Sequence, residues 1–184
     1  MRVEKLRQAY DVDIQTVHFP LHPETPADGQ SLEQLFAGRD VDLDAMYQNM
    51  KARMDEEGLP YGKRTHTYNS RLAQELGKWA DTQDGGEAIH MKLYEAYFVE
   101  GRNIGDPDIL VEIAESVGLD GTAAREVIEE RSFEGAVDAD WEKSRQYGVT
   151  GVPTYVADAK GVVGAQPYEV LERLLDAAGA QKRN

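Results

Sequence analysis

The stretch QYGVTGVPTYVADAKGVVG, Gln146 to Gly164, decides the fold that we expect for this chain. Its first glycine, Gly148, follows a helical pattern and is typical of a residue that ends a helix. The pair Val152–Pro153 stands directly before residues of strand character. Because an X–Pro bond adopts the cis form at a cost of only about 0.5–1 kcal/mol, a strand that begins this way can start from a cis peptide bond.

The rest of this stretch predicts a β-hairpin and a closing helix. Thr154–Ala157 is rich in residues that favour strands, and Val162 and Val163 continue the pattern after a turn over Asp158–Gly161. Gly161 is expected to supply the positive φ that closes the turn. The following segment, QPYEVLERLLDAAG, has Pro167 in its first turn and leucines at helical spacing, which predicts an amphipathic helix.

Upstream of this stretch, residues 43–147 show helical periodicity throughout. The helix starts are marked by capping residues, Asp42 or Asp44 for the first helix and Asp106 before Pro107 for a later one. The first helix carries Met46, Met50 and Met54 on one face. The segment EAIHMKLYEAYFVEG is apolar on two faces and is expected at the centre of a helical bundle. We expect no strand in this part of the chain.

The N-terminal part begins with MRVEKLRQAY, in which Val3, Leu6 and Tyr10 stand at helical spacing. A strand is expected over Val12–Phe19, ended by Pro20. A proline-rich loop follows, with a short helical turn at Leu32–Phe36. Strand, helical segment, hairpin and final helix together predict an α/β domain interrupted by an all-helical segment.

Composition excludes several functional classes. The 184 residues carry a net charge of −14, which opposes binding to nucleic acid or to anionic lipid. No apolar run approaches the roughly 18 residues of a membrane-spanning helix, and the N-terminus resembles no export signal, so we expect a cytoplasmic protein with no membrane partner. There is no cysteine, which excludes disulfides, thiolate metal sites and a cysteine nucleophile within these residues.

Four segments in this order resemble one family. HFPLHPETP, NSRLAQELGKWA, LYEAYFVEGRNIGDPDILVEIAESVGLD and YGVTGVPTYVADAKGVVGAQPYEVLERLL are similar to the DsbA-like thioredoxin proteins of the FrnE type, which are related to hydroxychromene-carboxylate isomerases and kappa-class glutathione transferases. The resemblance implies a thioredoxin-like fold with an inserted all-helical domain. It places the thioredoxin-like domain at residues 1–40 and 148–184 and the helical domain at residues 41–147.

The resemblance also implies a feature that this chain lacks. Family members begin with a strand and a Cys-x-x-Cys pair at the start of the first helix, whereas VEKLRQAY resembles only the later turns of that helix. We therefore expect a thiol–disulfide oxidoreductase of the DsbA type that is truncated before its redox motif and is inactive as given. No catalytic residue is assigned.

Three residues are expected to bind substrate by this resemblance. Val152 would present its main-chain N–H and C=O to an extended thiol substrate beside a cis Pro153. Asn69 stands where the isomerases and kappa transferases have an asparagine near glutathione, although the same residue could instead cap the helix that begins near Arg71. The partner expected is a protein or peptide that contains a thiol or a disulfide, with glutathione as an alternative.

No cofactor and no metal are expected. His18 and His22 are four residues apart, but Pro20 and Pro23 exclude the helix that would bring them to one ion. His66 is expected as a solvated loop residue. Where glutathione-binding relatives have an acidic residue followed by arginine, this chain has Gln166 and Pro167, which favours the thiol oxidoreductases.

Three functions remain open from the sequence: the oxidoreductase type, a non-enzymatic peptide-binding module, and a glutathione-dependent isomerase. One structural consequence follows from the missing first strand. It leaves Val12–Phe19 and Thr154–Ala157 without the neighbour that would lie between them, so we expect a gapped sheet and unpaired edges through which copies could self-associate.

Overall fold

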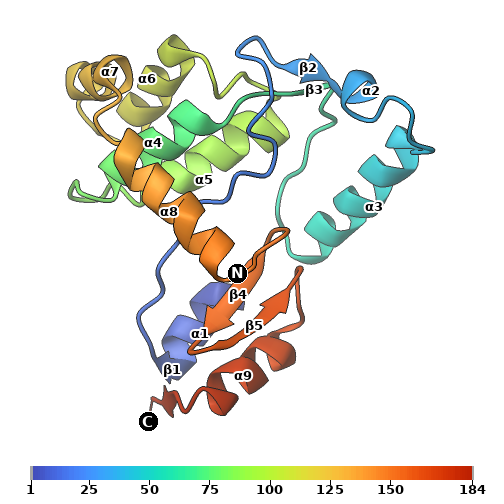
Figure 1. The fold of residues 1–184 in the computed structure, drawn as a ribbon, viewed down its shortest axis with the longest axis vertical. Coiled ribbons are helices and arrows are strands. Elements are labelled where there is room, and N and C mark those ends of the chain that lie inside the picture. The colour runs from blue at the N-terminus through green and yellow to red at the C-terminus, as the bar shows by residue number, and fades with distance from the viewer. Residues whose placement is uncertain (1, 184) are drawn as a thin grey trace. The chain divides into compact units, whose positions relative to one another are not determined.

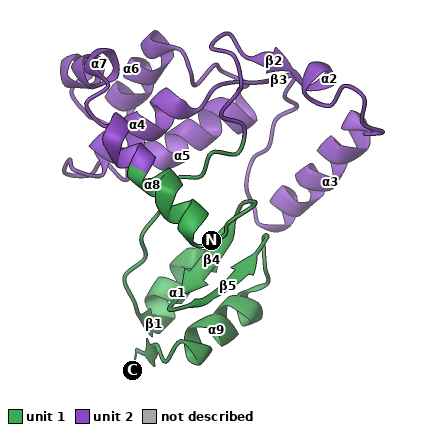
Figure 2. Ribbon diagram, viewed as in Figure 1, with its two compact units in different colours: residues 1–21, 139–184 green, residues 22–138 purple. Residues whose placement is uncertain are grey.

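The computed structural model describes residues 2–183. The chain divides into two compact units, unit 1 with residues 1–21 and 139–184, and unit 2 with residues 22–138 (Figure 2). Helix α8 (Glu134–Gln146) crosses the boundary between them. The two compact units divide at 21/22 and 138/139. The domain limits expected from the sequence, 40/41 and 147/148, stay a prediction.

Unit 1 combines short strands with helices (Figure 1). Its elements besides the end of α8 are α1 (Arg2–Ala9), β1 (Tyr10–Asp11), β4 (Thr154–Ala157), β5 (Lys160–Val163), α9 (Tyr168–Ala177) and β6 (Gln181–Lys182). A small core forms around Leu6, Tyr10 and Leu171. Tyr155 and Val162, which are register partners, pack against this core, so one face of the hairpin is covered.

The prediction of a strand over Val12–Phe19 is wrong. Only Tyr10 and Asp11 form a strand, and they pair antiparallel with Lys182 and Gln181 of β6. Isolated β-propensity does not make a strand without a neighbour that accepts its hydrogen bonds, and no described strand pairs with residues 12–19. The segment is instead held by single contacts, such as the main-chain N–H of His18 to Asp140 Oδ2 at 3.0 Å.

The hairpin itself is confirmed, with a different turn. Ala157 pairs with Lys160, so the turn is the two residues Asp158 and Ala159, and Gly161 lies within β5. Asp158 takes the positive φ, at 55°. Aspartate tolerates this region because its short polar side chain can hydrogen-bond locally. Among the described strands β4 pairs only with β5, so its other edge is unpaired. The gapped sheet expected from the sequence does not form, because no strand over Val12–Phe19 lies on the far side of a gap.

Unit 2 is mainly helical. Its elements are β2 (Gln30–Ser31), α2 (Leu32–Leu35), α3 (Leu43–Glu56), β3 (His66–Thr67), α4 (Arg71–Ala80), α5 (Ala88–Tyr94), the π-helix η1 (Glu95–Val99), α6 (Pro107–Ser116) and α7 (Gly121–Glu130). Its core gathers fully buried side chains from successive helices, among them Leu76, Ile89 and Leu110. Within residues 2–183 no helix is both long and apolar enough to cross a bilayer.

The predicted helix starts hold, and two predictions for this unit fail. Asp42 Oδ1 accepts from the N–H of Ala45 at 2.9 Å, and Asp106 Oδ1 from that of Asp108 at 2.8 Å. The expectation of no strand was wrong, because β2 and β3 form a short antiparallel pair. The segment expected at the bundle centre is buried on one side only, at Ile89 and Ala96.

Candidate substrate-binding site

One edge of β4 has its main-chain polar groups turned away from the hairpin. The N–H of Gly164 donates to the C=O of Pro153 at 2.7 Å, which makes these two residues a hydrogen-bonded pair. Hydrogen-bonded and non-hydrogen-bonded pairs alternate along an antiparallel ladder. Thr154 and Val156 are therefore non-hydrogen-bonded positions opposite Val163 and Gly161, and their N–H and C=O groups point to the unpaired edge.

The residue before this edge is open as well. Val152 is 51% exposed, and within residues 2–183 no hydrogen bond engages its main-chain N–H or C=O. The Val152–Pro153 peptide bond is cis, as predicted. Thr154 Oγ1 donates to the C=O of Gly151 at 2.7 Å, which ties the loop to the strand. Val152, Thr154 and Val156 thus present a row of main-chain donors and acceptors that an extended peptide can pair with.

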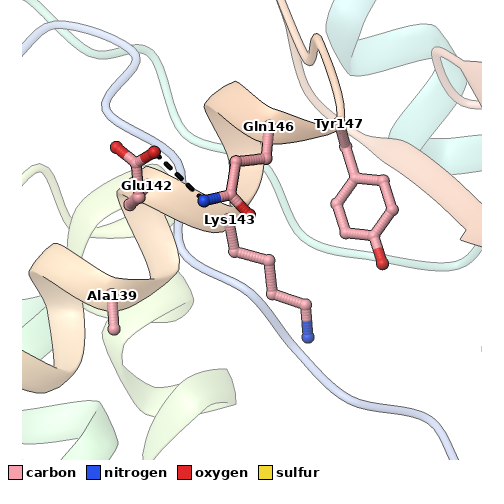
Figure 3. Close-up of a pocket in the computed structure, with 5 residues that line it drawn as sticks. All are labelled: Ala139, Glu142, Lys143, Gln146 and Tyr147. Carbon is pink, nitrogen blue, oxygen red and sulfur yellow. Dashed lines mark hydrogen bonds between the residues drawn. The ribbon is translucent and has the colours of Figure 1, made fainter.

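The end of α8, just before this loop, forms an open hollow of about 590 Å³ (Figure 3). Its lining residues all lie in unit 1 and are Ala139, Glu142, Lys143, Gln146 and Tyr147. Figure 3 shows Lys143 and Tyr147, one turn apart, extending in the same direction. Tyr147 is 54% exposed, so its ring can meet an apolar side chain.

Charges in this hollow are paired. Arg145 Nη2 lies 2.7 Å from Glu142 Oε2 and holds the pKa of that carboxyl below its ordinary value. Lys143 Nζ donates to Gln15 Oε1 at 2.8 Å. Because these groups already have partners, the charged side chains that line the hollow are not placed to hold an ion.

Asn69 lies in unit 2, whereas Val152 and Pro153 lie in unit 1. Its Oδ1 accepts from the N–H of Arg71 at 2.9 Å, and its Nδ2 donates to the C=O of Thr25 at 2.8 Å. The side chain therefore connects the start of α4 to the proline-rich loop. Its predicted role toward substrate stays a prediction.

The histidines do not build a site together. His66 is exposed and stacks on Tyr68 with ring centroids 6.0 Å apart, and His22 lies 3.7 Å from Glu24. No cluster of three or more His, Asp or Glu side chains suited to a metal ion occurs among residues 2–183.

The sequence pointed to Val152 and Pro153 but missed Thr154, Val156 and Tyr147. The main-chain groups of Thr154 and Val156 point outward because of the register in which β4 pairs with β5. The sequence alone did not define that register. The alternation of Thr154 and Val156 with Tyr155, a core residue, was the one available signal.

Comparison with known proteins now decides the family. The model of the DSBA-like thioredoxin domain matches residues 1–176. This chain belongs to that family. Its α/β thioredoxin-like fold with a helical insertion, as expected from the sequence, is thereby confirmed.

Two curated proteins match part of the chain. The uncharacterized protein YwbO of Bacillus subtilis (strain 168) is 32% identical over 114 residues, which is 60% of this chain and 55% of YwbO. The ClpXP adapter protein SpxH of Halalkalibacterium halodurans is 27% identical over 119 residues, or 61% of this chain and 39% of SpxH. The matched region thus spans about half or less of these relatives.

Solved structures agree on the fold. A probable DsbA oxidoreductase from Streptomyces coelicolor superimposes with a TM-score of 0.87 at 32% identity, over 97% of this chain and 82% of that one. A 2-hydroxychromene-2-carboxylate isomerase gives 0.72 at 22% identity, covering 97% and 85% of the two chains. The cytosolic disulfide reductase DsbM of Pseudomonas aeruginosa gives 0.53 at 22%, covering 77% and 87%. The last two likenesses concern the fold alone.

Proposed function

We propose that this chain binds the polypeptide substrate of a DsbA-type thiol–disulfide exchange reaction. The observation that carries the proposal is the open row of main-chain groups at Val152, Thr154 and Val156. An extended peptide placed along β4 would exchange hydrogen bonds with these residues and add a strand to the hairpin. The family and its oxidoreductase relative support a substrate that contains a thiol or a disulfide.

The chemical step needs a thiolate, because disulfide exchange proceeds by thiolate attack on a disulfide sulfur. None of the 184 residues is a cysteine. We therefore propose that this chain supplies binding and alignment and does not itself exchange disulfides. In an insulin-reduction assay with dithiothreitol we expect the pure chain to add nothing to the background rate.

Binding is tested with a ten-residue peptide that contains one disulfide and carries a fluorescent label. Val152→Pro and Val156→Pro each remove one outward N–H. Val156 makes no ladder hydrogen bond to β5, so its replacement spares the hairpin. Loss of one hydrogen bond, worth about 0.5–1.5 kcal/mol, should weaken binding between about twofold and tenfold.

A matched control is Val163→Ser, which removes an apolar side chain of similar exposure, 56%, from β5 and leaves the β4 edge intact. It should bind the peptide as the unchanged protein does. Equal affinity for all three variants and the unchanged protein would refute binding along β4.

A second candidate, a peptide-binding module with no part in redox chemistry, is favoured by the absence of cysteine. It predicts that peptides with serine in place of cysteine bind equally well, whereas the redox proposal predicts a preference for the disulfide form. Glutathione use is disfavoured, because this chain has Gln166 and Pro167 where glutathione-binding relatives have an acidic residue followed by arginine. Gln166 Nε2 instead donates to the C=O of Val163 at 2.6 Å, in the turn before α9. A calorimetric titration with glutathione should give no binding heat.

A further inference from the structure

Helix α3 differs from the other long helices in having no buried side chain. It is 14 residues long, from Leu43 to Glu56, and none of its residues is buried. Every other described helix of eight or more residues buries at least one. Most helical stability in proteins comes from the packing of one face, so a helix of this length with no buried side chain lacks its usual source of stability.

One face of α3 is attached to the following segment. The Tyr47 ring stacks on Tyr61 with centroids 6.0 Å apart, and Lys63 Nζ lies 2.6 Å from Asp44 Oδ1. Another face, with Met46 and Met50 one turn apart, is open. Their side chains are 36% and 40% exposed. Unbranched thioethers on an open helix face are typical of surfaces that adapt to varied apolar partners.

Acidic residues lie at both ends of the helix that carries this methionine face. Between positions 40 and 57 the chain has six acidic residues and two basic ones, and the acids lie at the two ends of α3. At the C-terminal end, Lys51 pairs with Asp55 at 2.7 Å. The two basic residues, Lys51 and Arg53, lie between these acidic ends, and acids outnumber bases six to two. A methionine face with this excess of negative charge complements a segment with apolar side chains between basic ones.

We propose that the Met46–Met50 face of α3 docks a cationic peptide segment that carries apolar side chains, such as an unfolded stretch rich in leucine and lysine. The proposal is independent of the hydrogen-bonding edge of β4, because it concerns unit 2 and requires neither a thiol nor a disulfide. Binding would bury the methionines and give α3 the packed face that it otherwise lacks.

The test uses a labelled 18-residue peptide of leucine and lysine without cysteine, and the same peptide with glutamate for lysine. Fluorescence anisotropy should show binding of the lysine peptide, weakened by salt, and little binding of the glutamate peptide. Met46→Ser with Met50→Ser should weaken binding about tenfold or more, as expected for loss of central apolar contacts. The Val163→Ser variant, whose change lies in β5 of unit 1, should bind as the unchanged protein does.

Two measurements distinguish loss of the apolar face from loss of helix α3 itself. Met46→Leu with Met50→Leu keeps an apolar face and good helix propensity, so it should retain binding. Hydrogen exchange of α3 amides should slow when the lysine peptide is added. Equal binding of both peptides, or full binding by the serine variant, would overturn the proposal. A dimer seen by light scattering and lost in the serine variant would also overturn it, since the occupant would then be a second copy.

Discussion

The buried carboxylate of Glu75 allows the sharpest prediction. Its side chain is 1% exposed and lies between two arginines of unit 2. Arg71 Nε is 2.6 Å from Oε1, and Arg131 reaches both oxygens, Nε to Oε2 at 2.6 Å and Nη2 to Oε1 at 2.7 Å. Replacing Glu75 with Gln removes the charge at constant size and leaves two guanidinium groups facing an amide.

The expected cost follows from this burial. Removing one partner of a buried ion pair costs about 3–5 kcal/mol. Arg131 is 38% exposed and can turn toward water, so we expect the lower end, about 3 kcal/mol. With a urea m-value of about 1–3 kcal/mol/M, the midpoint should fall by roughly 1–3 M. The exposed neighbour Asp138, 2.7 Å from Arg71, provides the control, because Asp138→Asn should cost less than about 1 kcal/mol.

The assay is urea unfolding followed by tryptophan fluorescence. The chain has two tryptophans, of which Trp79 lies in α4 near Glu75, so a Trp141→Phe background makes Trp79 the reporter of unit 2. A Glu75→Gln free energy of unfolding within about 0.5 kcal/mol of the parent would refute the reasoning, because surface substitutions produce changes of that size.

The stability difference between the parent protein and Glu75→Gln depends on pH, and the direction follows from the pKa of Glu75. Burial acts to raise the pKa of Glu75, but hydrogen bonds from Arg131 and Arg71 outweigh it and hold that pKa below its ordinary value. A carboxyl with a depressed folded-state pKa stabilises the protein above its unfolded pKa of about 4.3, and this contribution is lost as the pH falls through the folded pKa. The stability difference between parent and Glu75→Gln should therefore be full at pH 7 and shrink below pH 4.

Three further predictions concern other parts of the chain. Tyr10 is buried and its hydroxyl donates to Asp176 Oδ1 at 2.6 Å; burial and this carboxylate raise the pKa of Tyr10 to about 12. Ultraviolet titration of the nine tyrosines should show a last step near that pH that is absent in Tyr10→Phe. The stability that the Tyr10 hydroxyl contributes should be full below pH 10 and should disappear as the pH rises through 12. Asp106→Ala should destabilise unit 2 by about 1 kcal/mol in the same urea assay, because it removes the cap of α6, whereas the exposed Asp84→Ala should be neutral. Copies of the chain are expected to associate through the β4 edge at high protein concentration. Association should increase at high salt, because the net charge of −14 is then screened. Light scattering should show less association in Val156→Pro.

Part of the fold was predictable because it depends on neighbours in the sequence. Asp42 and Asp106 cap their helices by bonds to residues two or three positions on, and Gly118 and Gly148 have the positive φ that ends a helix. Such contacts form wherever the local residues allow them. The helical part, the hairpin and the final helix could therefore be recognised from local patterns.

The candidate site was predictable in part for the same reason. Val152 and Pro153 stood out because a proline directly before strand residues is a local pattern. Thr154 and Val156 did not, since their outward direction follows from the pairing of β4 with β5. Asn69 was predicted with two roles, and its bond to Arg71 is the local one, while its bond to Thr25 joins residues 44 apart in sequence.

The sequence by itself determined the family, the helical segments and the absence of a sulfur nucleophile, because these rest on residue identity and short-range spacing. Only the tertiary structure decided which residues pair across long separations. Tyr10 pairs with Lys182 in β1–β6, and Glu75 meets Arg131, 56 residues on. It also decided that Val12–Phe19 forms no strand, because a strand forms only where a second segment supplies hydrogen-bonding partners.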